Sequence, residues 1–495
     1  MTPPDLTVSL YTAEQVRRID RAAIENCGIA GIELMRRAAD AVFATLRRRW
    51  PDARRIAVLA GGGNNGGDAL LVGSLALQHG LDVDAFASPN APKGDAERAR
   101  AMFVQAGGRV AAIDPLPDLS NADVIVDGLF GTGLARHVEG EVAALIVRAN
   151  ESGRPILAID IPSGLSSDTG MRLGTAIRAQ ATVSLVAWKR GLFTGDAADC
   201  VGARELAPLD VPPAAYERIV PDATLIGGAI AHTLPPRRGN VNKGNFGHVL
   251  AIGGDHGMGG AIRLAGEAAL RCGAGLVSVA TRESNVAALV AGRPELMARG
   301  VEEARALQGM LARATVVALG PGLGRAEWGV ALWRAAMATA LPLVVDADAL
   351  NLLAAEPRAL PNAVLTPHPG EAARLLGTDV ATVQADRFAA VRTLAQRYAA
   401  VVVLKGAGSL IGATHGRVAA CPWGNAGMAT AGMGDVLTGV IAALLAQGLA
   451  PWDAACTGVA WHARAGDLAA GDAPRGLIAS DLFAPLRELA NGSRP

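Results

Sequence analysis

The chain has 495 residues, of which 51% are hydrophobic and 19% are charged. This is enough apolar material for two or three folded domains, and it argues against a disordered protein. Lysine plus arginine and aspartate plus glutamate both number 46, so the chain lacks the basic surplus expected of a nucleic-acid binder.

The cysteines and the N-terminal segment favour a cytoplasmic protein. The five cysteines are scattered and form no CxxC pair, which supports neither a disulfide framework nor a zinc site. The first ten residues contain Pro3, Pro4 and Asp5 and no signal sequence. No apolar run reaches the roughly 18 residues that a membrane helix needs. We therefore expect a cytoplasmic protein that binds neither nucleic acid nor membrane.

Short runs rich in Val, Ile and Leu recur along the chain, and each is predicted to be a strand. In chain order they are residues 56–60, 124–127, 156–160, 183–186, 249–252, 276–280, 316–319, 343–346 and 401–404. Their near-continuous apolarity is typical of strands buried on both faces of a parallel sheet. Alanine-rich helical segments separate them, such as residues 68–79 and 260–271, and glycine follows each. This alternation predicts doubly wound α/β architecture, in which ligands bind beyond the carboxyl ends of the strands.

A proline-rich segment interrupts the alternation between Leu209 and Asn245. It contains Pro212, Pro213, Pro221, Pro235 and Pro236. Proline clusters of this kind favour a linker, so we predict one domain at residues 1–218 and a second at 225–495. Each half has its own glycine-rich loops, which predicts two separate sites.

In the N-terminal half, the strand at 56–60 leads into a glycine-rich loop with the sequence GGGNNGGD at residues 61–68. Glycines let the backbone approach a phosphate, and the start of the following helix offers free N–H groups. A tight turn alone would explain the glycines, but the two asparagines and the aspartate exceed what a turn needs.

Two further strand ends should meet this loop if the sheet is parallel. Residues 127–133 have the sequence DGLFGTG, and residues 160–165 have the sequence DIPSGL. Their carboxylate and hydroxyl oxygens, with the amides of the loop, could enclose a hard cation. Each aspartate taken singly would equally suit a cap or a turn.

These motifs, together with the segments LYTAEQ at 10–15 and ELM at 33–35, make residues 9–210 resemble the NAD(P)H-hydrate epimerase domain. The resemblance implies that hydrated nucleotide is bound by Asn64, Asn65, Gly66, Gly67, Asp68, Gly131, Thr132, Gly133, Leu134, Ala135, Arg136, His137 and Asp160. It also implies a potassium ion held by Asn65, Asp127 and Ser163. Asp160 is a plausible proton shuttle for epimerisation. Ala69 stands where the family commonly has another glycine, a difference of one methyl group.

The C-terminal half carries glycine-rich segments at 253–260 and 320–324, then TPHPGE at 366–371 and KGAGS at 405–409. The last motif, Gly434-Asp435, opens a long apolar helix. N–H groups at such a start can hold a phosphoryl group while the carboxylate faces the attacking hydroxyl. The helix dipole should favour the ionised carboxylate and so make it a weaker base. A simple first-turn acid is the alternative for Asp435.

Residues 230–490 resemble the ribokinase-like superfamily, and more closely the ADP/ATP-dependent NAD(P)H-hydrate dehydratases. The resemblance implies hydrate binding by Ala261, Gly322, His368 and Asp435, with Asp435 catalytic. It implies that the adenine nucleotide is bound by Lys405, Gly406, Ala407, Gly408, Ser409 and Gly434. Ser409 replaces the usual threonine, and Met433 replaces a common serine. Without the resemblance, His368 would be an ordinary turn histidine and Lys405 a solvated strand end.

Together the resemblances imply two doubly wound domains, the first Rossmann-like and the second ribokinase-like. They imply a bifunctional repair enzyme that interconverts the R- and S-forms of hydrated NADH and NADPH (NADHX and NADPHX). It would dehydrate the S-form with ADP or ATP and magnesium, releasing AMP or ADP and phosphate. The bacterial composition favours ADP, and we expect a homo-oligomer.

Two other functions remain open at this stage. A vitamin or sugar kinase of the same superfamily would share Gly434-Asp435, but it would leave the Asn64–Asp68 motif unexplained. A nucleotide-sensing N-terminal module without catalysis would not need Asn65, Asp127, Asp160 and Ser163 together.

Overall fold

The structure, a computed structural model, describes residues 5–227 and 234–492. Its internal contacts divide the chain into two compact units, residues 1–224 and 225–495. Part of the proline-rich segment, residues 228–233, lies outside the described residues. Among the described residues, none of the helices combines the length and the apolar character that crossing a membrane requires.

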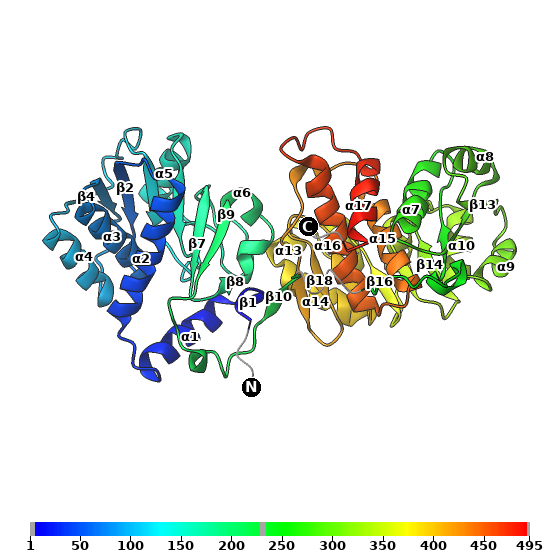
Figure 1. The fold of residues 1–495 in the computed structure, drawn as a ribbon, viewed down its shortest axis with the longest axis horizontal. Coiled ribbons are helices and arrows are strands. Elements are labelled where there is room, and N and C mark those ends of the chain that lie inside the picture. The colour runs from blue at the N-terminus through cyan, green and yellow to red at the C-terminus, as the bar shows by residue number, and fades with distance from the viewer. Residues whose placement is uncertain (1–4, 228–233, 493–495) are drawn as a thin grey trace. The chain divides into compact units, whose positions relative to one another are not determined.

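The first unit contains a seven-stranded parallel sheet with the strand order β4-β3-β2-β5-β6-β7-β9 (Figure 1). Its strands are β2 (Arg55–Ala60), β3 (Asp82–Ala87), β4 (Val110–Ala112), β5 (Val124–Gly128), β6 (Ile156–Ile159), β7 (Ala181–Leu185) and β9 (Ala203–Ala207). Its helices are α1 (Ala13–Glu25), α2 (Gly31–Arg49), α3 (Asn64–Gln78), α4 (Asp95–Gln105), α5 (Gly140–Glu151) and α6 (Ala197–Cys200). Separately, β1 (Ser9–Tyr11) pairs with β8 (Trp188–Lys189) and β10 (Ala223–Leu225).

Both faces of this sheet are buried, and β2 shows why the sequence of such a strand is apolar at nearly every position. Ile56 and Val58 belong to a core shared with α1, α2 and α3, whereas Ala57 and Leu59 belong to a second core shared with α5. Successive side chains of a strand point to opposite faces. An alternating polar pattern would therefore leave one of the two cores unfilled.

The strand order creates a crevice between β2 and β5. The chain leaves β2 toward β3 on one side and later returns to β5 on the other, which is the switch point where doubly wound folds bind ligands. Ala60 pairs with Gly128, so the loops that follow the two strands start side by side. Gly61 is required there because a Cβ atom would collide with the carbonyl oxygen of Leu129.

The second unit contains strands in the order β13-β12-β11-β14-β15-β16-β17-β18-β19, parallel up to β17 and antiparallel beyond it. They are β11 (His248–Ile252), β12 (Leu276–Thr281), β13 (Met297–Gly300), β14 (Val316–Leu319), β15 (Leu343–Val345), β16 (Ala363–Leu365), β17 (Val401–Leu404), β18 (Leu410–Gly412) and β19 (Val418–Ala420). The helices are α7 (Gly259–Arg271), α8 (Glu283–Gly292), α9 (Gln308–Leu311), α10 (Glu327–Met337), α11 (Ala347–Ala355), α12 (Pro369–Leu376), α13 (Val380–Ala385), α14 (Arg387–Tyr398), α15 (Met433–Ala446), α16 (Pro451–Ala470) and α17 (Phe483–Leu489).

The central helix of this unit is α15, which is buried along most of its length. Val436 and Val440 share a core with Val249 of β11 and Val316 of β14. This packing fixes the N-terminal end of α15 relative to the sheet. The switch point lies between β11 and β14, at the glycine-rich segments that follow both strands.

The structure confirms the α/β class and places a strand at each of the nine predicted apolar runs. One helix boundary was wrong, because the helix predicted at residues 68–79 begins at Asn64. The residues from Asn64 to Asp68 therefore form the first turn of α3 and are not a loop. The glycines at 66 and 67 are accommodated there by close packing against Gly61 and Met35.

Candidate active sites

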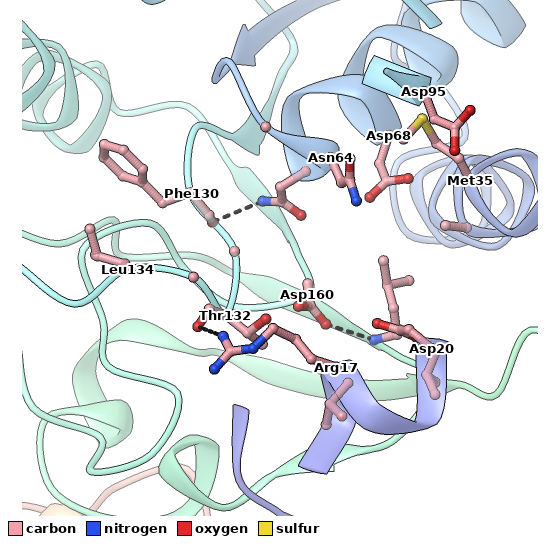
Figure 2. Close-up of a pocket in the computed structure, with 18 of the residues that line it drawn as sticks. Arg17, Asp20, Met35, Asn64, Asp68, Asp95, Phe130, Thr132, Leu134 and Asp160 are labelled. Carbon is pink, nitrogen blue, oxygen red and sulfur yellow. Dashed lines mark hydrogen bonds between the residues drawn. The ribbon is translucent and has the colours of Figure 1, made fainter. Parts of the chain in front are cut away.

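A cavity of about 720 Å³ lies at the switch point of the first unit. Its walls come from α1, α2, the first turn of α3 and the loops after β5 and β6 (Figure 2). The volume suits a small organic ligand. Two groups of polar side chains, one beneath the β5 loop and one in the wall, give the cavity its chemistry.

The first group connects Asn65, Asp127 and Ser163. The fully buried carboxylate of Asp127 accepts hydrogen bonds from the backbone N–H of Ser163 at 2.8 Å and from its hydroxyl at 2.6 Å. The Asn65 amide donates to the carbonyl of Phe130 at 2.8 Å, and the Phe130 N–H donates to the Ser163 hydroxyl at 2.8 Å. Burial raises the pKa of Asp127 to about 6, although its bonds to Ser163 lower it.

This group has the chemistry of a hard-cation site. A carboxylate, a hydroxyl and an amide supply oxygen donors, which alkali and alkaline-earth ions prefer. The residues predicted to hold potassium are therefore brought together, at the base of the loop that follows β5.

The second group places three carboxyl groups around one ammonium. Asp20 comes from α1, Asp68 from α3 and Asp160 from the end of β6, and Figure 2 shows all three lining the cavity. Asp160 forms an ion pair with the buried Lys189 and accepts a hydrogen bond from Leu185 N at 3.1 Å. Its backbone has a φ of 68°, a left-handed conformation that is uncommon for non-glycine residues and has to be held by the surrounding structure.

Burial dominates the electrostatics of these acids. The pKa of Asp68 lies well above its ordinary value because the side chain is buried and because Asp160 and Asp20 are close. Burial also raises the pKa of Asp20 to about 6, against the lowering effect of Lys189. Both carboxyl groups are therefore harder to ionise than exposed aspartates, and a positive charge placed in the cavity would favour their ionised forms.

The predicted phosphate loop largely lines the cavity. Residues 131–136 all contribute to its wall, and Arg17 of α1 donates to the Thr132 carbonyl at 3.5 Å. Among the described residues, Gly66, Gly67 and His137 of the predicted set do not line the cavity.

The cavity wall also contains three residues that were not predicted from the sequence, Arg17, Asp20 and Lys189. Arg17 and Asp20 lie on α1, whose pattern indicates an ordinary amphipathic helix. Lys189 closely follows the strand of residues 181–185, and a lysine just beyond an apolar run was the one signal in the sequence.

The second candidate site lies at the N-terminal end of α15. Asp435 is in the first turn of this helix. A Cβ atom on Gly434 would lie 3.1 Å from Lys405 Nζ and 3.6 Å from Asp346 Oδ2. Lys405 Nζ donates to Asp346 Oδ1 at 2.8 Å, and the Thr438 hydroxyl donates to Asp346 Oδ2 at 2.9 Å. The ends of β15, β17 and α15 therefore converge on one polar cluster.

The pKa of Asp435 departs from its ordinary value in the direction opposite to the one expected from the helix dipole alone. Burial and the nearby Asp346 raise the pKa of Asp435 to about 7, and Lys405 offsets them only in part. Burial likewise raises the pKa of Glu371 to about 7, and its carboxylate lies 3.9 Å from Lys405 Nζ. Desolvation at this helix start outweighs the dipole because the side chains are enclosed by the sheet edge.

His368 has a structural role in the second unit. It caps α12, with its Nδ1 accepting a hydrogen bond from Gly370 N at 2.9 Å. The backbone N–H of His368 donates a hydrogen bond to Glu371 Oε2 at 2.9 Å. This bond to Glu371 helps to hold its carboxylate near Lys405. Burial and the charge of Lys405 lower the pKa of His368, which favours the neutral ring.

The remaining predicted residues lie on two turns of the same unit. Gly322 and Ala261 are neighbours, because a Cβ atom on Gly322 would lie 3.4 Å from that of Ala261. The segment 405–409 follows β17, and the Ser409 hydroxyl donates to the Gly406 carbonyl at 3.1 Å. Beneath this turn the buried Arg387 donates to backbone carbonyls of residues 404 and 405, each at 3.2 Å.

Asp346, Thr438 and Arg387 were not among the predicted site residues. Asp346 ends a predicted strand, and a carboxylate at the end of a buried strand was its only signal. Thr438 and Arg387 are unremarkable members of helices in the sequence, and only the fold brings them to the site.

Both units match models of known families. Residues 31–191 match the model described as YjeF-related protein N-terminus, and residues 249–487 match the model described as NAD(P)H-hydrate dehydratase. The bifunctional NAD(P)H-hydrate repair enzyme of Coxiella burnetii is 44% identical over 490 residues, covering 97% of this chain and 99% of that protein. That of Escherichia coli is 43% identical over 493 residues, covering 99% and 95%. A solved ribokinase-like superfamily protein from Enterococcus faecalis is 30% identical with a TM-score of 0.50, covering 54% of this chain and 94% of that one.

Proposed function

The chain belongs to the family of bifunctional NAD(P)H-hydrate repair enzymes, and we propose how its two sites divide that work. It contains an epimerase domain in the N-terminal unit and an ADP/ATP-dependent dehydratase domain in the C-terminal unit. The substrate is NADH or NADPH that has taken up water and carries a hydroxyl at C6 of the reduced ring. The observation that carries the proposal is that each unit has its own carboxylate cluster beyond the carboxyl ends of its own parallel strands.

In the epimerase unit, the cavity takes the hydrated nucleotide. The first turn of α3 and residues 131–136 bind its phosphates through backbone N–H groups, because a helix start and a glycine-rich loop both favour anions. Asp160 faces the reacting ring and moves protons at C6. Its fixed left-handed backbone and its bonds to Lys189 and Leu185 support this role, since they hold the carboxylate against the cavity.

A potassium ion would be held by Asn65, Asp127 and Ser163. The oxygen donors of these three side chains suit it, and Asp127 supplies the formal negative charge. A bound cation would fix the loop after β5, whose residues line the cavity, and would supply positive charge near the phosphates. Asn65 links that loop to α3 through its bond to Phe130.

In the dehydratase unit, Asp435 accepts the proton of the C6 hydroxyl while the hydroxyl oxygen attacks the terminal phosphorus of the nucleotide. The bond from that phosphorus to its bridging oxygen breaks, and AMP leaves if the donor is ADP. The C6–O bond then breaks with loss of phosphate, a proton leaves C5, and the C5=C6 double bond of NAD(P)H forms. Phosphate is a far better leaving group than hydroxide, which explains the consumption of a nucleotide.

The surrounding residues position and neutralise the transferred phosphoryl group. Lys405 lies beside Gly434, where its ammonium can contact phosphate oxygens near the α15 N–H groups. Asp346 and Glu371 are carboxylates that suit Mg²⁺, which would arrive with the nucleotide and screen the charge of its phosphates. We propose ADP as the donor. A cytoplasmic location would give the enzyme access to the NADH and NADPH pools.

A test of this function uses chemically prepared NADHX containing both epimers. Full conversion to NADH, seen as the return of dihydronicotinamide absorbance, is expected with ADP and absent without it. A kinase of the same superfamily would instead consume nucleotide without regenerating NADH. If the N-terminal unit were a sensor without catalysis, conversion would stop once the S-form is exhausted. Only the slow spontaneous interconversion of the epimers, measured without enzyme, would then continue.

A further inference from the structure

Lys189 is a buried ammonium that lines the epimerase cavity. Its side chain has 0% exposure to solvent, and it is one of the residues of the cavity wall. Its Nζ forms an ion pair with Asp160 and donates to the Leu185 carbonyl at 2.6 Å and to the Ser184 hydroxyl at 3.3 Å. These three contacts use all three N–H groups of the ammonium and fix its position relative to the Asp160 carboxylate. To donate to a substrate hydroxyl, the ammonium must exchange one of them, and the contact to Ser184 is the longest.

The charges around Lys189 do not balance as a simple structural ion pair would. Asp20 and Asp68 also lie near it, so three carboxyl groups surround one buried cation. Two other basic residues line the cavity: Arg136, which is exposed, and Arg17 of α1, which is about half exposed and pairs with Glu14 at 3.0 Å. A wall with an excess of carboxyl groups stabilises a positive charge that develops inside the cavity.

Such a charge arises if the C6 hydroxyl leaves the substrate. The nitrogen of the reduced ring can supply the electrons that expel the hydroxyl, which leaves a C6=N1 double bond and a positively charged ring. Hydroxide leaves poorly by itself, so this step needs a proton donor next to C6.

Given the epimerase function proposed above, we propose that Lys189 is the catalytic acid that protonates the leaving C6 hydroxyl. The C6–O bond breaks with both electrons going to oxygen, which takes a proton from Lys189 Nζ and departs as water. The N1 lone pair becomes the second bond of C6=N1, and Lys189 is left as a neutral amine.

The reverse addition completes the epimerisation. Water attacks the opposite face of C6, and the electrons of the double bond return to N1. The proton released by this water goes to the Asp160 carboxylate and passes to the Lys189 amine across their existing contact. The stereochemistry at C6 is inverted, and no proton, electron or co-reactant is consumed.

Asp20 and Asp68 act on the cationic ring and not on the hydroxyl. They come from α1 and α3, whereas Asp160 and Lys189 come from the ends of β6 and β8. Their contribution in this scheme is to stabilise the positive charge that exists between departure and addition.

The test replaces Lys189 in the full-length enzyme and measures both activities. Purified R-epimer reports epimerisation, followed by chromatographic separation of the epimers without nucleotide, and the spontaneous rate is subtracted. Purified S-epimer with ADP reports the dehydratase unit of the same chain. Lys189→Ala is expected to slow epimerisation by about 10²- to 10⁴-fold, the usual effect of losing a general acid, and to leave dehydration unchanged. Lys93→Ala, which removes an exposed lysine of the same unit, should change neither activity.

Two further measurements separate an acid from a charge that merely neutralises Asp160. Lys189→Arg keeps a positive charge beside Asp160, but a guanidinium does not give up its proton in proteins, so the epimerisation defect should persist. Primary alkylammonium ions added to Lys189→Ala should restore activity, with a rate that depends on the pKa of the amine.

Near-normal epimerisation by Lys189→Arg, or rescue by amines regardless of their pKa, would overturn the proposal. A Lys189→Ala enzyme that retains more than a tenth of the wild-type epimerase rate would also overturn it. Failure of the wild-type enzyme to convert the R-epimer would instead overturn the epimerase function itself. If Lys189→Ala melts well below wild type, the arginine variant decides the question.

Discussion

Asp435→Asn is the substitution that bears most directly on the dehydratase mechanism. It keeps the size of the side chain at the start of α15 and removes its ability to accept a proton. Asp346, Lys405 and Thr438 bond to one another and not to Asp435, so their cluster should stay intact. Nucleotide binding should therefore change little, while dehydration falls by about 10²- to 10⁴-fold, or roughly 3–5 kcal/mol of barrier.

The structure also predicts the pH dependence of the wild-type reaction. Burial and Asp346 raise the pKa of Asp435 to about 7, and the base must be ionised to act. The kcat/KM for S-epimer should thus fall about tenfold for each pH unit below about 7 and level off above it. Asp435→Asn should lose this slope.

Stability provides an independent control on the same variant. A carboxyl whose pKa is raised in the folded state contributes stability below its unfolded pKa near 4 and loses it as pH rises through about 7. Above pH 7 the buried charge is therefore a cost, of at most about 4 kcal/mol before solvent screening. Asp435→Asn should melt no lower than wild type at pH 8.

Dihydronicotinamide absorbance with purified S-epimer and ADP measures the rate, and calorimetry measures nucleotide affinity. A variant that keeps more than about a tenth of the wild-type rate would reduce Asp435 to a first-turn acid. So would a wild-type pH profile without a decline below pH 7.

Three other variants test the remaining assignments. Asp127→Ala should weaken epimerisation and its dependence on potassium concentration while dehydration of S-epimer stays near wild type; equal loss of both activities would indicate misfolding. Asp346→Asn removes the carboxylate that pairs with Lys405 at 2.8 Å, so dehydration should fall at least tenfold and KM for ADP should rise; unchanged kinetics with varied Mg²⁺ would contradict this. A protein of residues 1–218 should fold alone and epimerise, and one ending at residue 224 should melt higher because Ala223 and Thr224 pair with β1; insolubility of both would refute an independent first unit.

The motifs at strand ends were predictable from the sequence because each is contiguous. The glycines at 61–63, the aspartates at 127 and 160 and the Gly434-Asp435 pair all follow a buried strand or open a helix. The parallel-sheet rule then places such ends at one edge. The structure adds the register, with Ala60 opposite Gly128, that brings Asn65 within reach of Phe130.

The partners of those motifs were not predictable, because distant segments supply them. Asp20 lies on a helix whose sequence shows only amphipathic spacing, and Asp346 reaches Lys405 and Thr438 across separations of 59 and 92 residues. The pKa of Asp435 departs in the direction opposite to the one expected from the helix dipole alone, because the dipole can be read from sequence whereas desolvation depends on the packed surroundings.

The most direct test of the account is the product balance of the full-length enzyme with mixed NADHX epimers and excess ADP. We predict that NADH, AMP and phosphate form in a one-to-one-to-one ratio, and that all of the hydrate, including the R-form, is consumed at an enzyme-dependent rate. Accumulation of a stable phosphorylated hydrate, or persistence of the R-form at its spontaneous rate, would contradict a chain that both epimerises and dehydrates.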